Sequence, residues 1–428
     1  MSDSADQATH AVFAQLGTLL LEADLSVTDV RGALESVHRA TVSPETADFA
    51  VLPEMVFVSP KNARTSTISG VVSSPPLSIR QAAQAIRLVR LVRLGQVPLD
   101  GIISRVDEIR ASTMRHADLS WTVGGALISV GLALVFRCPW WAVVMALLLG
   151  AVIGALSTFM NRIGPAVALI PFVAAFVSTA AVGILAMWLS LGPVPLFAVC
   201  APVALLVPGA LITNGILELT ATDIVTGSAR LMYGLIVLGF MLVGILAGSA
   251  VTGLRVDSRS ATLVGQTHAL IPLAGGWQLL PPVWLGWIGV AAVAVGVSVA
   301  FGSGTKLTLV SVVMMVCTYA ILEVLSPFLG SVVATGVAGA VLFIVSRTLE
   351  RMTFAVPAAI SFRPAFLLLV PGTIGLVALA SVGSPQDSVA PFTFLSLCIG
   401  VKVGSVVTDT RWGSVFTRRN PRSKPVSE

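Results

Sequence analysis

The feature that most constrains this chain is a series of long apolar runs, which begins at about Trp121 and continues almost to the C-terminus. A helix needs about 20 apolar residues to cross the hydrocarbon layer of a bilayer. Only 11% of the 428 residues are charged, whereas soluble domains carry about 25%. A soluble globule has too little interior to bury so much apolar surface. The chain is therefore expected to be a polytopic α-helical membrane protein.

About ten of the runs are candidate transmembrane helices. They lie near residues 121–136, 139–160, 166–190, 193–214, 224–252, 283–301, 307–326, 327–346, 357–380 and 388–408. The first run is short, and the boundary at Pro327 between the seventh and eighth runs is tight. Nine spans is therefore an open alternative.

The residues before the first span differ in character, because they hold many of the ionisable groups and include strand-like runs such as FAVLPEMVFVSP. They predict a small cytosolic α/β domain, since the polar start MSDSADQATH does not resemble a signal peptide. Basic residues concentrate in the loops expected inside, which predicts an inner-membrane protein with both termini in the cytosol. The expected organisation is this domain at 1–118, a first five-helix membrane half at 119–254, an extracytoplasmic loop at 255–282, a second five-helix half at 283–408 and a basic cytosolic tail at 409–428.

Two of the spans share a motif. The fourth span contains LVPG at Leu206–Gly209, and the ninth contains LVPG at Leu369–Gly372. Each motif falls in the fourth span of a set of five, and because five is odd, the two halves are expected to form an inverted repeat. Proline interrupts a helix, and paired interruptions at matching places in two halves indicate a substrate site. Kinks that serve packing alone are the alternative interpretation.

The run LLVPGALITNGILELTATDIVTGSARL resembles the signature of the threonine/serine exporter family. The matching positions are Pro208, Gly209, Thr213, Asn214, Asp223, Gly227 and Arg230. Glu218 stands where the family usually has Asp, and Thr222 stands where it usually has Gly. The N-terminal run LGTLLLEADLSVTDVRGALESVHRA is similar to the opening helices of the family, and the resemblance covers nearly the whole chain.

This resemblance implies a secondary exporter of threonine and serine that is driven by the proton-motive force. Export of dicarboxylates such as succinate is an alternative, because relatives split into two chains are associated with it. A membrane sensor whose N-terminal domain signals is a further alternative. The expected partners are an amino-acid substrate, protons and the lipid bilayer. The sequence does not determine the oligomeric state, and a homo-oligomer is one of the alternatives.

The expected substrate site combines the two interrupted spans. Its residues are Pro208, Gly209, Thr213 and Asn214 in the first half and Pro371, Gly372 and Thr373 in the second. A zwitterionic amino acid needs N–H donors for its carboxylate and carbonyl or carboxylate acceptors for its ammonium group. Interrupted helices expose backbone groups of both kinds.

Proton coupling needs an ionisable side chain within the membrane, where a charge is costly and marks a functional candidate. Asp223 and Glu218 are the first candidates, and Glu323 is the next. The other charges within spans are Arg230, Arg363 and Lys402.

Each of these charges also has a structural interpretation. Glu218, Asp223 and Arg230 fit ion pairs in a cytosolic loop equally well. Glu323 fits an interfacial position, and Lys402 fits snorkelling to the inner face. For Arg363, the alternative is a ninth span that begins later.

Enzymatic activity, a cofactor and a metal site are not expected. The four cysteines, Cys138, Cys200, Cys317 and Cys398, stand singly in apolar surroundings, and no CxxC or HExxH spacing occurs. The piece GSGTKLT at Gly302 lacks the spacing of a P-loop, which argues against an ATP-driven pump. The net charge of +5 follows from basic inner loops and gives no reason to expect nucleic-acid binding.

Overall fold

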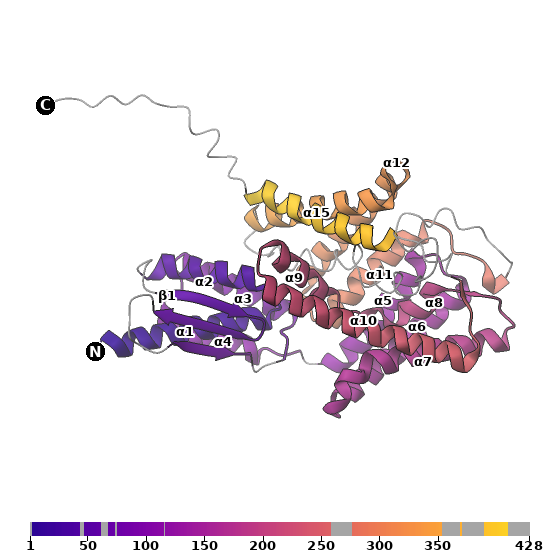
Figure 1. Ribbon diagram of the computed structural model, residues 1–428, viewed down its shortest axis with the longest axis horizontal. Helices are drawn as coiled ribbons and strands as arrows, with labels where there is room; N and C mark the ends of the chain where they lie inside the picture. Colours follow the sequence, from indigo (N-terminus) through magenta and orange to yellow (C-terminus); the bar gives the residue numbers. More distant parts are fainter. Residues whose placement is uncertain are drawn as a thin grey trace, which may run out of the picture.

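The computed structural model describes residues 2–42, 47–60, 67–72, 75–114, 116–257, 276–352, 369 and 389–409. The structure is mostly helical, and it places an N-terminal region, residues 2–114, at one end of a larger set of apolar helices (Figure 1).

The N-terminal region packs helices against a three-stranded antiparallel sheet with the strand order β1-β2-β3. Its elements are α1 (Ser2–Glu22), α2 (Val27–Thr41), β1 (Ala47–Leu52), β2 (Met55–Pro60), β3 (Ile68–Val71), α3 (Ile79–Arg93), the short 3-10 helix η1 (Leu99–Gly101) and α4 (Ile102–Ala111). Apolar side chains from helices and sheet, among them Phe13, Leu34 and Val56, are fully buried in a core of their own. This core is separate from the one formed by the apolar helices.

Local sequence explains where two of these helices begin. The Ser26 hydroxyl accepts the main-chain N–H of Asp29 at 3.1 Å and caps the start of α2. Ser78 and Gln81 form a reciprocal capping box at the start of α3. Such caps satisfy main-chain donors that have no partner within the helix.

The apolar part begins at α5 and accounts for the membrane character of the chain. Its elements are α5 (Ala117–Val135), α6 (Trp140–Asn161), η2 (Pro165–Leu169), α7 (Ile170–Trp188), β4 (Val194–Pro195), α8 (Leu196–Cys200), η3 (Ala201–Leu206), α9 (Gly209–Thr220), α10 (Ile224–Thr252), β5 (Val256–Asp257), η6 (Gly276–Gln278), α11 (Leu285–Ala300), α12 (Thr305–Met352) and α15 (Val389–Asp409). Within the described residues, five helices are long and apolar enough to cross a membrane, and one bent pair raises the number to six. The count of ten spans therefore stays a prediction.

The expected boundary between the seventh and eighth spans lies within α12. The helix contains Pro327, but its backbone leaves helical geometry at Gly330, where φ is 74° and ψ is 157°. Glycine reaches a positive φ without steric cost, so the chain bends three residues beyond the expected boundary. The expected ninth span at 357–380 lies outside the described residues, except for Leu369.

Glycine lets the first and sixth expected spans approach closely. Gly124 of α5 lies against Gly296 of α11, and Gly131 lies against Gly289, so the two helices run antiparallel. A Cβ on Gly131 would come within 2.6 Å of the Gly289 carbonyl oxygen. Small residues at such positions are typical of close helix packing in membranes.

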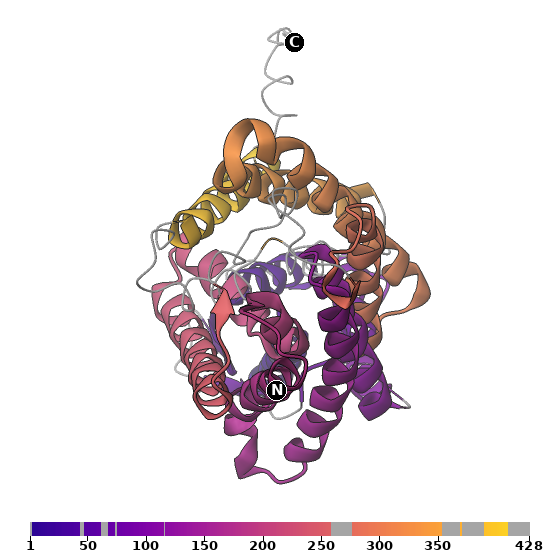
Figure 2. The same ribbon diagram turned by 90° about the vertical axis from the view of Figure 1, so that its right-hand side faces the viewer.

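The third and fifth expected spans pack in the same manner but run parallel. Gly244 of α10 lies against Phe172 of α7, and Gly248 lies against Phe176. Figure 2 looks along the long helices and shows this pair on the side opposite the orange and yellow helices.

The yellow helix is α15, and it packs against the second limb of α12, which is orange throughout. Gly400 of α15 lies against Gly336, and Gly404 lies against Ala340. The two helices therefore also run parallel, which is the relationship seen between α7 and α10.

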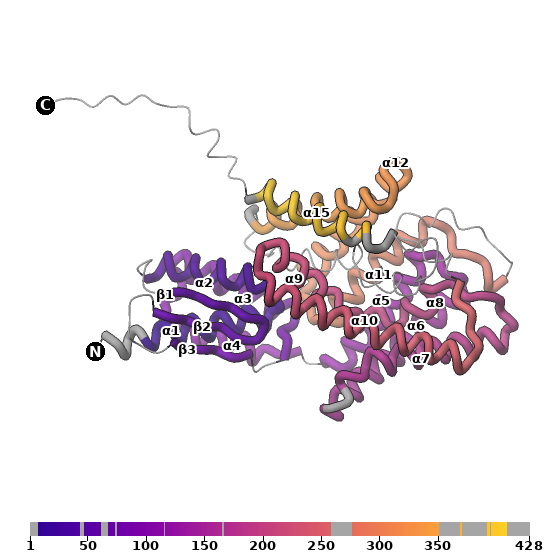
Figure 3. The backbone as a smooth tube through the Cα atoms, in the orientation of Figure 1, coloured from indigo at the N-terminus to yellow at the C-terminus, as the bar shows by residue number. Residues whose placement is uncertain are grey.

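The N-terminal region is joined to the second half of the chain through main-chain hydrogen bonds. The first N–H groups of α3 donate to the turn after α11: Ile79 N–H donates to the Phe301 carbonyl oxygen at 2.8 Å, and Arg80 N–H donates to that of Gly302 at 3.3 Å. The tube in Figure 3 shows that α9 also reaches this end of the molecule, beside the N-terminal helices.

Candidate functional site

The fourth expected span is broken at its LVPG motif. The segments Leu196–Leu206 and Gly209–Thr220 meet at 74°, with the break at Val207 and Pro208. Pro208 has φ −76° and ψ 51°, which places it outside helical geometry at the start of α9. The interruption that the first motif predicts is therefore present, and α9 leaves the direction of the preceding segment.

Helix α9 carries buried polar side chains beyond this break. Thr213, Asn214 and Glu218 are 4%, 5% and 0% exposed. The Thr213 hydroxyl donates to the Gly209 carbonyl oxygen within the same helix at 2.7 Å. Asn214 and Glu218 are four residues apart and therefore project from the same side of α9. Because α9 continues to Thr220, Glu218 lies in a helix, whereas Asp223 lies in the turn that follows it.

Glu218 forms a buried ion pair with Arg230 of α10. Arg230 Nη1 lies 2.7 Å from Glu218 Oε1, and the two side chains are 9% and 0% exposed. The pair depends on close packing of α9 and α10, since a Cβ on Gly227 would come within 2.7 Å of the Gly215 carbonyl oxygen. Desolvated charges are tolerated only when they are paired and hydrogen-bonded.

The turn between α1 and α2 contacts the same side of α9. Asn214 Nδ2 donates to the Asp24 carbonyl oxygen at 3.0 Å and to Asp24 Oδ1 at 3.3 Å. The main-chain N–H of Val27 donates to Glu218 Oε1 at 2.9 Å. Two segments that are separated by about 190 residues in the sequence therefore share a polar site.

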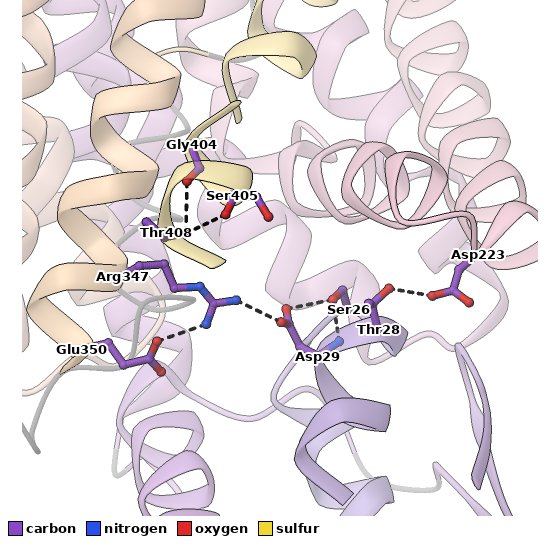
Figure 4. A network of polar contacts seen from close by, with 9 residues as sticks. All are labelled: Ser26, Thr28, Asp29, Asp223, Arg347, Glu350, Gly404, Ser405 and Thr408. Atoms are coloured by element: carbon purple, nitrogen blue, oxygen red, sulfur yellow. Dashed lines mark hydrogen bonds and ion pairs between the residues drawn. The ribbon is translucent and has the colours of Figure 1, made fainter. Parts of the chain in front are cut away.

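Asp223, in the turn between α9 and α10, extends this site. Its carboxylate accepts the Thr28 hydroxyl at 2.6 Å and pairs with Arg31 at 3.0 Å. Figure 4 shows Thr28 pointing toward Asp223 and, on the other side, Asp29 pointing toward Arg347 of α12. The distance from Arg347 Nη2 to Asp29 Oδ1 is 3.3 Å.

The remaining predicted residues lie elsewhere or outside the described chain. Glu323 lies half-buried in the first limb of α12, where it interacts with the Tyr319 hydroxyl. Lys402 of α15 donates to the Thr220 carbonyl oxygen at 2.9 Å and so caps the C-terminal end of α9. Arg363, Pro371, Gly372 and Thr373 lie outside the described residues.

Asp24, Thr28 and Arg31 belong to this site but were not among the sequence candidates. Their local sequence signals a helix start near Ser26 and nothing more. A contact between an N-terminal turn and α9 leaves no spacing pattern in a single sequence, so only the fold brings these residues to the site.

The arrangement brings together hydrogen-bond donors and acceptors and charges of both signs. Asn214 supplies an N–H donor, while Glu218 and Asp223 supply carboxylate acceptors. Arg230 offsets part of the negative charge through its pair with Glu218.

Comparison with known proteins agrees with the resemblance noted in the sequence. The family model described as "Putative threonine/serine exporter" (ThrE) matches residues 11–252, which is more than half of the chain. The match includes most of the N-terminal region and helices α5 to α10. No curated protein matches the chain significantly, and no solved structure does.

Proposed function

Because the chain belongs to the threonine/serine exporter family, we propose that it carries threonine and serine out of the cell across the inner membrane, with protons as the driving ion. One observation gives this proposal its main structural support. A span bent by 74° presents buried Asn214 and Glu218 beside Arg230. Charged groups in membrane segments are costly and mark ligand or ion pathways, and interrupted helices persist where protein encloses them.

The charges of the site favour an amino acid over a dicarboxylate. Asp24, Glu218 and Asp223 present three carboxylates, and two arginines, Arg230 beside Glu218 and Arg31 beside Asp223, offset only part of this charge. A dianion would meet unfavourable Coulomb energy here, whereas the ammonium group of an amino acid would be attracted. Glu218 and Asp223 are also the groups that we propose for proton coupling, because each can exchange a proton and both lie near the C-terminal end of α9, where Glu218 is fully buried.

In each expected half the third and fifth helices pack against each other, which supports the proposed inverted repeat. The third and fifth expected spans, α7 and α10, pack in parallel through Gly244 and Gly248. The eighth and tenth, the second limb of α12 and α15, pack in parallel through Gly400 and Gly404. The first and sixth run antiparallel, as an odd and an even span do in any chain that crosses the membrane at every span.

The test is efflux from cells loaded with threonine, serine or succinate, with and without a protonophore. We expect threonine and serine to leave faster when the chain is expressed, and the protonophore to abolish the gain. Efflux of succinate alone would support the dicarboxylate alternative. A tag at either terminus should stay shielded from impermeant reagents in intact cells, and labelling of either tag would contradict the proposed topology.

Proton coupling is tested by Asp223→Asn. We expect folded protein that no longer exports threonine against a gradient, because the proton-accepting carboxylate is gone. Asp118→Asn is the matched control, since Asp118 also pairs with an arginine, Arg162, but both side chains are exposed. Normal export by Asp223→Asn would show that Asp223 takes no part in proton coupling.

A further inference from the structure

The turn that occupies the polar site presents the same chemical groups as a hydroxylated amino acid. Asp24 offers a carbonyl and a carboxylate oxygen to Asn214, Val27 offers an N–H to Glu218, and Thr28 offers a hydroxyl to Asp223. Threonine and serine carry a carboxylate, an ammonium group and a hydroxyl. Each group of the turn thus has a counterpart in the substrate. We call residues 24–28 the docked turn.

The dimensions of the site also suit a small zwitterion. Asn214 and Glu218 lie four residues apart on one helix, which places their Cβ atoms about 5 to 6 Å apart. A single amino acid can therefore reach both side chains with its carboxylate and its ammonium group.

Glu218 has unused capacity for a ligand. Its Oε1 atom accepts both Val27 N–H and Arg230, whereas Oε2 is buried and has no hydrogen-bond partner among the described residues. A buried acceptor without a donor is unfavourable. A main-chain N–H supplies one donor where an ammonium group supplies three, so an amino acid satisfies Glu218 more completely than the docked turn does.

Building on the proposed function, we propose that the docked turn is a tethered occupant of the amino-acid site, which threonine or serine displaces from the cytosolic side before export. A group on the same chain competes with a free ligand at an effective concentration that the ligand must match. Export would then begin only when the cytosolic amino acid reaches a comparable concentration. The turn thereby sets a threshold concentration, below which cytosolic threonine and serine are not exported.

The N-terminal region has a second attachment that does not depend on the docked turn. Ile79 and Arg80 hold α3 against the turn after α11 through main-chain bonds that do not involve the docked turn.

Hydrogen–deuterium exchange of the full chain in lipid nanodiscs tests the displacement directly. Saturating threonine should increase exchange of the main-chain amides of residues 27–31, because Val27 N–H loses its Glu218 partner. Peptides from α3 should be unchanged. If threonine leaves exchange at 27–31 unchanged in protein that exports it, the tethered occupant is refuted while the proposed function stands. If succinate and not threonine increases exchange, the substrate class assigned to the turn is wrong.

A variant of the turn tests competition by kinetics. Thr28→Val removes the hydroxyl donated to Asp223 and should lower the half-saturating cytosolic threonine concentration about tenfold in inside-out vesicles, with an unchanged maximal rate. Glu35→Gln on the exposed side of α2 is the control and should change neither value. An unchanged half-saturating concentration in Thr28→Val, or a fall in its maximal rate alone, would contradict competition. Absence of threonine export by the unmodified chain would refute the proposed function itself.

Discussion

The Glu218 carboxylate and the Arg230 guanidinium lie 2.7 Å apart at the contact between α9 and α10, and water reaches almost none of either side chain. Removal of one partner from such a pair leaves an uncompensated buried charge, which costs far more than the net value of the pair. The pair therefore constrains both the stability of the protein and the polarity of the site beside it.

Replacement of Glu218 should show how much the pair contributes to the stability of the protein. Glu218→Gln leaves the Arg230 charge without a counter-ion, and we expect the free energy of unfolding to fall by about 3 to 5 kcal/mol. Glu218→Asp keeps the charge, and Asp is the residue that the family usually has at this position, so folding should be retained. Thermal unfolding of the two purified variants in detergent measures both stabilities.

The double variant Glu218→Met with Arg230→Met separates packing from function. Without charges to bury, it should recover most of the stability that Glu218→Gln loses, yet it should not export threonine. If the double variant exports normally, the pair serves only structure.

Thr222 lies in the short turn between α9 and α10 with a φ of 70°. A β-branched residue is strained in this left-handed conformation, whereas glycine is not. This strain explains why the family usually has glycine here. Thr222→Gly should therefore raise the free energy of unfolding by about 1 kcal/mol or more. Thr220→Gly, within the last turn of α9, is the matched control and should lower it, which guanidinium or thermal unfolding can measure.

Much of the helical layout could be predicted because apolar length alone fixes where a chain can cross lipid. Helix α10 begins and ends at the residues expected for the fifth span, Ile224–Thr252. The end of the fourth span was harder to predict. We expected it at 214, but α9 continues to Thr220. The pair with Arg230 allows the charged side chain of Glu218 to be buried within the helix, so the helix does not end before it.

Of the candidate site, only the part on the apolar helices could be proposed from the sequence. The LVPG motif located the break, and the resemblance located Asn214 and Asp223. The docked turn could not be predicted, because its contacts with α9 depend on how two folded parts meet. Asp24 and Thr28 look like ordinary residues at a helix start until α9 is placed beside them.

Two glycines of α10 should respond differently to the same substitution. A Cβ on Gly244 would clash with the Phe172 carbonyl oxygen of α7, whereas one on Gly239 would meet no atom within 4 Å. Gly244→Ala should therefore force the helices apart and lower thermal stability. Gly239→Ala should leave stability unchanged or raise it slightly, because alanine favours a helix more than glycine does. Equal effects of the two substitutions would contradict the close packing of α7 and α10.

His38 should make the stability of the N-terminal region depend on pH. Its ring is buried and lies 5.4 Å from that of Phe13 and 5.6 Å from that of Phe49. Burial, with a smaller contribution from the positive charge of His10, lowers the pKa of His38 below its usual value of 6.5. The folded state therefore resists protonation, while the unfolded state takes up a proton once the pH falls below about 6.5. Stability is complete above that pH and is lost as the pH falls from it toward the lowered pKa of the folded state.

The pH effect can be measured by hydrogen exchange of peptides from α2 and β1 in the full chain, with correction for the intrinsic exchange rate at each pH. Protection should decrease between pH 7.5 and pH 5.5. His38→Phe should remove most of this decrease, because a phenyl ring fills a similar space and does not titrate. His116→Asn is the control, since His116 is exposed and its replacement should leave the pH dependence as it is. Equal pH dependence in the His38→Phe variant and the unmodified chain would show that other groups cause it.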